Sequence, residues 1–237
     1  INAVKFLNGE EPVTLPRSQA YIGVLIDDLV TKGTNEPYRM MTSRAEHRLH
    51  LRMDNADVRL TPLGYELGLI SEERYAAFLK KQEQIQGEVE RLKKTLVRGD
   101  AETNAILREV GTAELRHGIT MAELLRRPEV KYGDLMRLTE MPDLPDNVQK
   151  SVEILVKYEG YLAKQEAAIE RFERMEEKLL PTNVDYTSLR GLSREAAEKL
   201  NKVKPRSLGQ AARISGVTPA DVNVLVIYLE TQKRGDN

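Results

Sequence analysis

The stretch DNVQKSVEILVKYEGYLAKQEAAIERFERMEEKL, residues 146–179, decides the fold because its apolar residues recur every three or four positions. That spacing is typical of an α-helix with one apolar face. The residues that can share this face are Val148, Val152, Leu155, Tyr158, Leu162, Ile169, Phe172 and Leu179, with Gln165 as a polar interruption. The pattern therefore predicts one long helix over residues 146–179.

A second long helix is predicted earlier in the chain. Ser71 followed by two glutamates predicts its start, because Ser is a preferred N-cap and acidic residues favour the first turn. A narrow, mostly apolar seam follows at Tyr75, Phe78, Gln82, Ile85, Val89, Leu92 and Leu96, and Gly99-Asp100 predicts the end. We expect the two long helices to form an antiparallel pair, joined by shorter segments that include a capping box of Thr120 and Glu123.

Residues 181–237 predict a small C-terminal three-helix module. Ser193, Ser207 and Thr218 each stand in an N-cap position, and Gln210 completes a capping box for Ser207. Pro219 is suited to the first position of a helix. Helices are therefore expected over about residues 194–203, 208–214 and 219–230.

The first 70 residues give weaker patterns. Ser43 with Glu46 predicts a capping box that begins a helix through residues 44–48, and Thr61-Pro62 predicts the start of a short helix that Gly68 ends. Residues 13–15 can form a short strand, and the apolar stretch 20–29 fits no single type. We expect residues 1–40, a short irregular or extended segment, to pack against something outside the chain. The predicted fold class is mainly α.

Composition narrows the possible functions. The 237 residues carry 36 basic and 37 acidic side chains, so the net charge of -1 gives no sign of a nucleic-acid binder, and any RNA contact needs local clusters of Arg and Lys. The sequence contains no cysteine, which excludes disulfides, zinc-thiolate sites and thiol catalysis within it. No apolar run has the length of a membrane span, and no signal peptide is visible. The chain begins with Ile, and we expect it to be part of a longer protein.

Nucleotide-binding loops are absent from the sequence. No two of its 15 glycines stand two residues apart, which excludes a GxGxxG fingerprint, and no GxxxxGK[ST] loop occurs. His47 and His50 stand three residues apart near Asp54, which leaves a metal-dependent hydrolase as a weak hypothesis without an evident further ligand. Gly160 inside a predicted helix costs about 1 kcal/mol relative to Ala, and it predicts the close approach of another backbone.

Two clusters of basic residues are candidates for phosphate contact. Arg44, Arg48 and Arg52 fall four apart, so a helix would align their guanidinium groups in one row, with Arg39 and Arg59 beyond its ends. Pairing within the chain remains open, because Glu36, Glu46, Asp54 and Asp57 nearly balance this charge. The second cluster comprises Lys199, Lys202, Lys204, Arg206 and Arg213, where a solvated face is the other interpretation.

Several long blocks of the sequence resemble one family. They are RSQAYIGVLIDDLVTKGT, EPYRMMTSRAEHRLHLRMDNADVRLTPLGYELGLIS, KYEGYLAKQ and DYTSLRGLSREAAEKLNKVKPRSLGQAARISGVTPADVNVLVIYL. In this order they are similar to the glucose-inhibited division protein A family, the tRNA uridine-5-carboxymethylaminomethyl modification enzymes. Residues 97–145 match less distinctly. The resemblance implies that residues 1–60 are the end of an FAD domain with its interface segment, residues 61–180 a long-helix region and residues 181–237 the terminal module.

The resemblance also implies an activity. A full-length enzyme would bind FAD and use NADH and, with a GTPase partner, modify C5 of the wobble uridine of tRNA. Such enzymes are cytoplasmic homodimers. No catalytic residue, cofactor or metal is expected in this fragment itself, because the flavin motif and catalytic cysteines of the family would precede residue 1. The fragment is thus expected to be the tRNA- and partner-binding portion; the alternative is a purely structural dimerisation or scaffold module without RNA contact.

Site residues follow from the resemblance position by position. Candidates for tRNA phosphates or for the interface with the flavin domain are Arg39, Ser43, Arg44, Glu46, Arg48, Arg52, Asn55, Asp57 and Arg59. Candidates for the GTPase partner are Arg190, Gly191, Lys204, Pro205, Gly209, Gln210, Arg213 and Gly216. His47 and His50 stand where the family usually has an aromatic and an apolar residue, which favours a structural role for both.

Overall fold

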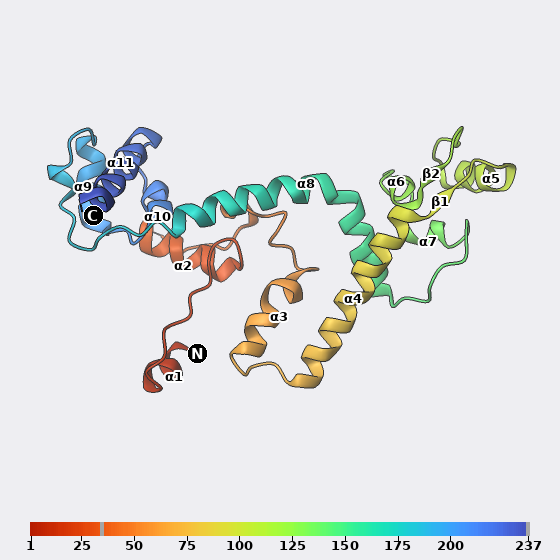
Figure 1. Cartoon of the computed structure of the whole chain (residues 1–237), viewed down its shortest axis with the longest axis horizontal. Helices are drawn as coiled ribbons and strands as arrows, with labels where there is room; N and C mark the ends of the chain where they lie inside the picture. Colours follow the sequence, from red (N-terminus) through yellow and green to blue (C-terminus); the bar gives the residue numbers. More distant parts are fainter. Residues whose placement is uncertain (34–35, 236–237) are drawn as a thin grey trace. The chain divides into compact units, whose positions relative to one another are not determined.

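The computed structural model describes the backbone of residues 1–33 and 36–235, and side chains up to residue 232. The part of the chain that it describes is mainly helical, with a single two-stranded sheet. The chain divides into two compact units, Ile1–Leu51 with Lys164–Asn237, and Arg52–Ala163. Helix α8 (Asp146–Glu176) contributes to both units (Figure 1). The prediction of a mainly helical fold is confirmed.

Unit 2, Arg52–Ala163, is built around helix α4 (Glu72–Lys94), on which α3 (Ala56–Glu66) and α6 (Met121–Leu125) pack most extensively. The smaller elements gather near the end of α4 (Figure 1); they are β1 (Leu96–Val97), α5 (Ala101–Val110), β2 (Ile119–Thr120) and α7 (Tyr132–Leu135). They share one buried core with Ile85 and Leu92 of α4 and with Val148, Val152 and Val156 of α8. The long helices therefore meet within a core that includes the short elements, instead of along one isolated seam.

Helix α4 begins where the sequence predicts and ends earlier. The Ser71 hydroxyl accepts from the Arg74 N–H at 3.4 Å, which confirms the N-cap. The predicted end at Gly99 is wrong, because Leu96 and Val97 leave the helix to pair with Thr120 and Ile119 in an antiparallel ladder. Asp100 then caps α5, a helix that was not predicted, by accepting from Thr103 N–H at 2.8 Å.

Helix α3 begins at Ala56, five residues before the predicted Thr61 start, and Pro62 lies inside it. A tertiary contact holds its first turn, because the Asp57 carboxylate accepts from Lys81 of α4 at 2.7 Å. Gly68, with φ of +70°, ends the helix as predicted, since its N–H bonds Tyr65 O at 2.9 Å in the left-handed conformation that glycine favours.

The surroundings of Gly160 in α8 contradict the predicted close approach of another backbone. A Cβ added there would meet nothing within 4 Å in the part of the chain that the structure describes. The expected approach of another backbone is therefore wrong within this chain.

Unit 1 contains the N-terminal segment, with α1 (Asn2–Leu7), α2 (Tyr21–Thr31) and the 3₁₀ turn η1 (Thr42–Arg44). Residues 13–15 have no regular secondary structure, so the predicted strand is wrong; the Val13 backbone instead bonds the Asn2 side chain at 2.8 and 2.9 Å. Val24 of α2 packs with Ala45 and Leu51 in a small buried cluster. These three residues thus find packing partners inside unit 1.

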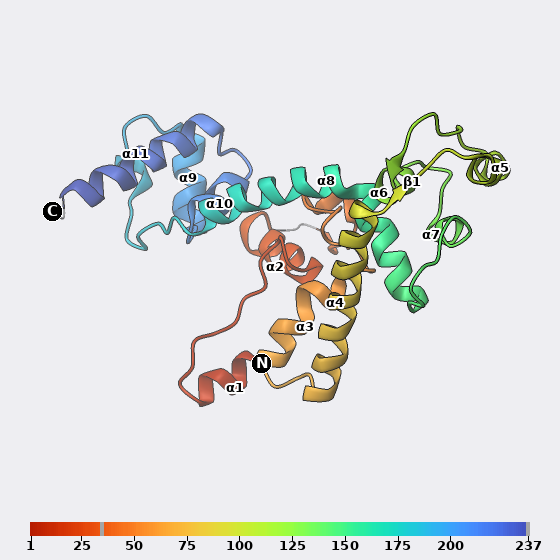
Figure 2. The same ribbon diagram turned by 45° about the vertical axis from the view of Figure 1, so that its right-hand side comes forward.

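The C-terminal module contains the 3₁₀ turn η2 (Tyr186–Ser188), α9 (Arg194–Val203), α10 (Leu208–Arg213) and α11 (Pro219–Gly235), gathered as a small bundle (Figure 2). Ser193, Ser207 and Thr218 accept from the N–H three residues on, which confirms the three predicted N-caps. The Gln210 side chain bonds the N–H of Arg206 at 2.6 Å instead of completing a box with Ser207. The predicted three-helix module is otherwise confirmed.

Candidate nucleic-acid interface

The predicted row of guanidinium groups does not form, because residues 44–48 are not an α-helix. Ala45 is extended at φ −93° and ψ 121°, and η1 ends at Arg44. The Glu46 carboxylate, predicted to cap the helix, instead accepts from Arg17 at 2.8 and 3.0 Å. Arg17 also donates to the carbonyl of Arg44 at 3.3 Å. A long-range ion pair therefore overrides the local capping pattern.

Arg17 is the centre of a buried network in unit 1. Its side chain is 2% exposed and also pairs with Asp28, itself 3% exposed, at 2.8 Å and with Asp27 at 3.1 Å. Burial lowers the pKa of Arg17, but Glu46 and Asp28 outweigh it and raise the pKa above its usual value. The guanidinium is thus fully engaged inside the protein.

Arg213 of α10 belongs to the same network and is not a free partner-binding group. It donates to Asp27 at 2.7 and 2.9 Å and to Glu176 of α8, and its guanidinium stacks on the Phe172 ring at 4.9 Å. Its side chain is 12% exposed. The contacts join α2, α8 and α10 within one unit.

Arg44 has an aromatic partner. Its guanidinium lies 4.4 Å from the centre of the Tyr38 ring, and the Tyr38 hydroxyl donates to Asp28 at 2.7 Å. The Nε of Arg44 is buried without a hydrogen-bond partner in the described residues. This side chain is therefore only partly available to a ligand.

His47 packs inside unit 1. It is 5% exposed, meets Phe172 edge-on with ring centres 5.5 Å apart, and its Nδ1 lies 2.9 Å from the amide of Gln165. This contact explains the polar interruption on α8. Burial lowers the pKa of His47 below its usual value, which favours the neutral ring. Among the described residues, no group of three or more His, Cys, Asp or Glu side chains could hold a metal ion.

Arg39 and Arg48 are the exposed cations of the candidate block. Both side chains are exposed, and no salt bridge joins either one to a carboxylate in the described residues. Ser43 is also exposed and does not cap a helix. Guanidinium groups in this state are available to an anionic partner.

The remaining block candidates lie in unit 2 and contact one another. Arg52 pairs with Asp54 at 3.0 Å, and Arg59 donates to Asn55 at 3.2 Å and to the carbonyl of Arg52 at 2.8 Å. Asp57 is bonded to Lys81, as described above. These residues mainly fix the start of α3.

The candidates in the terminal module divide into structural and exposed residues. Gly191 and Gly216 have φ of +99° and +94°, and a Cβ on Gly209 would collide with the Glu176 side chain. Pro205 is buried, whereas Arg190 and Lys204 are exposed. Within this set, Arg190 and Lys204 therefore offer positive charge to a partner.

Asp221 is a buried capping residue that was not predicted. It is 2% exposed and accepts from the N–H of Ser193 at 2.8 Å and of Thr218 at 2.9 Å, tying α9 to α11. Burial raises the pKa of this carboxyl, but the Ser193 and Thr218 donors outweigh it and lower the pKa from 3.8 to about 2. The ionised form is therefore favoured by folding.

Asp221→Ala is expected to lower the free energy of unfolding by about 2 kcal/mol near neutral pH, because the N–H groups of Ser193 and Thr218 lose a charged acceptor. A depressed pKa in the folded state means that the stabilisation is present above the unfolded pKa of 3.8 and is lost as the pH falls through about 2. The difference in the free energy of unfolding between wild type and variant should therefore shrink as the pH falls from 3.8 to about 2, measured by urea titrations followed by circular dichroism. Glu230→Ala, at an exposed position of α11, is the control; a pH-independent gap contradicts the assignment.

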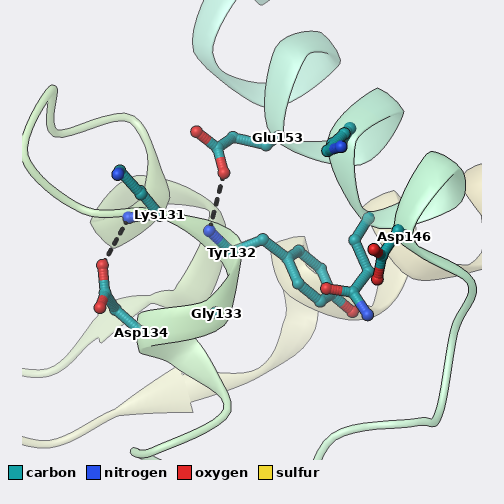
Figure 3. A pocket seen from close by; sticks show the side chains of 8 residues that line it. Lys131, Tyr132, Gly133, Asp134, Asp146 and Glu153 are labelled. Carbon is teal, nitrogen blue, oxygen red and sulfur yellow. Dashed lines mark hydrogen bonds between the residues drawn. The ribbon is translucent and has the colours of Figure 1, made fainter.

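One shallow pocket of about 330 Å³ lies in unit 2 between α7 and the start of α8 (Figure 3). Its lining mixes two lysines with three carboxylates; these residues are Lys131, Lys150, Asp134, Asp146 and Glu153. Glu153 accepts from the Tyr132 N–H and Asp134 from the Lys131 N–H, both at 2.8 Å. Two of the three carboxylates are thus occupied by backbone N–H groups, and the lining carries both signs of charge. The pocket therefore gives no reason to expect an anionic ligand. Within the described residues, no helix combines the length and the apolar character that crossing a membrane requires.

Two models of known protein families match most of the chain. Residues 72–166 match the model of the "tRNA modifying enzyme MnmG/GidA C-terminal helical domain", and residues 168–237 match that of the "C-terminal helical bundle" of the same enzyme. The chain is thus the C-terminal helical region of a class of tRNA-modifying enzymes. It belongs to the MnmG/GidA family.

Individual relatives agree with this assignment. The tRNA uridine 5-carboxymethylaminomethyl modification enzyme MnmG of Caldicellulosiruptor saccharolyticus is 56% identical over 99% of the chain, and that of Listeria welshimeri 53% over 98%. The chain spans only 38% and 37% of their lengths. A crystal structure of Aquifex aeolicus GidA has a TM-score of 0.79 and 40% identity, covering 96% of this chain and 36% of its own. The resemblance inferred from the sequence blocks is confirmed.

Sequence reasoning missed the Arg17 network. One signal was present: Asp28 falls four residues after Val24 and three before Thr31, which places a carboxylate on the face of α2 that Val24 and Thr31 bury. A charged residue on an apolar face predicts a buried partner of opposite charge. The partner itself could not be predicted from spacing, because Glu46 lies 29 residues from Arg17.

Proposed function

We propose that this chain is the tRNA- and partner-binding portion of an enzyme that uses FAD and NADH to modify C5 of the wobble uridine in tRNA. The name of its relatives, tRNA uridine 5-carboxymethylaminomethyl modification enzyme, supports tRNA as the substrate and uridine modification as the reaction. Because the chain corresponds to less than two fifths of those relatives, we assign FAD, NADH and the catalytic groups to the remainder of the enzyme.

The observation that carries the RNA assignment is the exposure of Arg39 and Arg48. Five other arginines (Arg17, Arg44, Arg52, Arg59 and Arg213) are held by contacts within the chain. In the described part of the block from residue 39 to residue 59, Arg39 and Arg48 are exposed without a carboxylate partner. Arginine binds phosphate oxygens in bidentate fashion, so this pair supports contact with an RNA backbone.

Arg39→Glu combined with Arg48→Glu is expected to weaken binding of an unmodified tRNA transcript by about tenfold near 0.1 M salt, and to reduce the salt dependence of binding. Fluorescence anisotropy over a salt series measures both quantities. The matched control is Arg171→Glu with Arg174→Glu, which makes the same charge change at exposed positions of α8 in the same unit. Circular dichroism establishes that each variant is folded.

Unchanged affinity and salt dependence in the folded Arg39/Arg48 variant would favour the second candidate, a structural dimerisation or scaffold module. A specific feature supports that candidate. Helix α2 carries an exposed apolar face formed by Ile22, Ile26, Leu29 and Val30, which are 50%, 55%, 43% and 61% exposed. Apolar faces of this kind are typical of protein interfaces.

The remaining assignments concern assembly. We assign the tRNA-modification GTPase to the terminal module, where Arg190 is exposed, and we propose a cytoplasmic homodimer for the whole enzyme. These assignments rest on the family resemblance of the module and on its surface charge.

A further inference from the structure

The turn between α9 and α10 has an unusual backbone. Lys204 has φ of 53° and ψ of 61°, and in the part of the chain that the structure describes it is the single residue other than glycine with positive φ. Glycine is the preferred residue at such a helix C-cap, because a side chain there costs on the order of 1 kcal/mol. A lysine kept in a strained position indicates that its side chain has a use beyond closing the helix.

Hydrogen bonds and burial hold this turn rigid. The Lys204 N–H bonds Leu200 O at 2.8 Å, Pro205 is buried, and the Arg206 N–H bonds the Gln210 side chain at 2.6 Å. The segment after α8 lies alongside the turn, since Leu180 N–H donates to Arg206 O at 2.8 Å and Leu208 N–H donates to Lys178 O at 3.0 Å. Four cations, Lys178, Lys202, Lys204 and Arg206, are thereby presented from a fixed scaffold.

Positive charge exceeds negative charge on these segments. Residues 177–185 and 200–210 contain the four cations and two carboxylates, Glu177 and Asp185. All four cations are exposed, and no salt bridge joins them to a carboxylate among the described residues. Asp185 accepts from Thr187 and Asn201, and Lys204 contributes to lowering its pKa. The surface is therefore cationic and already ordered.

We propose that this surface (Lys178, Lys202, Lys204 and Arg206, here the KVKPR surface) binds phosphate groups of the tRNA backbone. The inference rests on the proposed function and adds a second RNA contact within unit 1, which also contains Arg39 and Arg48. Contacts to the phosphates of an RNA backbone need closely spaced cations on a rigid element and no group that reads a base. The turn between α9 and α10 provides such cations. The strain at Lys204 is explained if its ammonium group is one of those contacts.

Lys204→Gly separates charge from backbone strain, because glycine adopts the same conformation at no steric cost. We expect the variant to be at least as stable as the wild type and yet to bind an unmodified tRNA transcript about threefold more weakly near 0.1 M salt. Lys202→Glu with Arg206→Glu is expected to weaken binding by about tenfold and to lower the salt dependence. The control is Arg194→Glu, whose side chain is 94% exposed on α9 of the same module.

The outcomes distinguish this inference from the proposed function. Unchanged tRNA binding by both KVKPR variants, together with weaker binding by the Arg39/Arg48 variant, overturns the inference alone. Failure of the unaltered 237-residue chain to bind tRNA overturns both. If the KVKPR variants keep tRNA affinity but lose binding to the purified tRNA-modification GTPase, the surface is a protein contact and the inference is wrong. Loss of RNA affinity with intact folding, and a Lys204→Gly chain at least as stable as the wild type, supports it.

Discussion

Arg17→Ala is expected to lower the free energy of unfolding of unit 1 by about 3–5 kcal/mol, the cost of removing one partner from a buried ion pair. Asp28, with a side chain only 3% exposed, would lose its 2.8 Å partner, and Glu46 would lose the guanidinium that holds residues 45–47 in place. The Arg44 carbonyl would lose a donor as well. The penalty comes mostly from charges left without partners, and only in part from the lost contacts themselves.

Lys32→Ala is the matched control for this prediction. Lys32 bonds the same Asp28 carboxylate at 2.9 Å, but its side chain is 41% exposed. Because water reaches the lysine end of this pair, its contribution is expected to be at most about 1 kcal/mol. Urea denaturation followed by circular dichroism, with hydrogen exchange to assign the loss to unit 1, measures both variants. If Arg17→Ala costs no more than Lys32→Ala, the network does not have the central role assigned to it.

The Arg17 network also explains which parts of the fold could be predicted from the sequence. The N-caps at Ser71, Thr120 and Ser193 were predicted correctly because each depends on a donor only three residues away. The helix over residues 44–48 was predicted from the same kind of local pattern and is wrong. The Glu46 carboxylate accepts from Arg17, which lies 29 residues away in the sequence. The spacing of residues within a short stretch carries no information about that contact.

The candidate site was predictable to a similar extent. The resemblance selected a block rich in arginine, but residue types alone could not separate exposed Arg48 from Arg44, which lies 4.4 Å over the Tyr38 ring. In the terminal module, Arg213 and Lys204 looked equivalent by charge. The structure assigns Arg213 to Asp27 and Glu176, and leaves Lys204 exposed on a left-handed backbone. Burial and partner distance decide between such residues, and both are set by tertiary packing.

Gly23→Ala is expected to lower the free energy of unfolding by about 3 kcal/mol, at the upper end of the usual cost of overpacking. A Cβ on Gly23 of α2 would lie 2.6 Å from Pro16 O and 2.8 Å from Pro16 C, and it would also collide with the backbone of Leu15. These atoms cannot move freely, because Pro16 O accepts from the N–H groups of Gln19 and Ala20. Displacing that turn would also move Arg17 away from Asp28.

Gly160→Ala is expected to have the opposite sign and to stabilise the chain by up to about 1 kcal/mol, the helix propensity gained when alanine replaces glycine. Gly160 lies inside α8, and a Cβ there would enter open space, whereas a Cβ on Gly23 would meet the backbone of residues 15–16. Both glycines are helical, so their difference in a thermal or urea unfolding experiment isolates packing from propensity. Equal effects of the two substitutions would contradict the close contact of α2 with residues 15–16. A stabilised Gly160→Ala chain would mean that this glycine, costly to the helix, is not required by any contact within the chain itself.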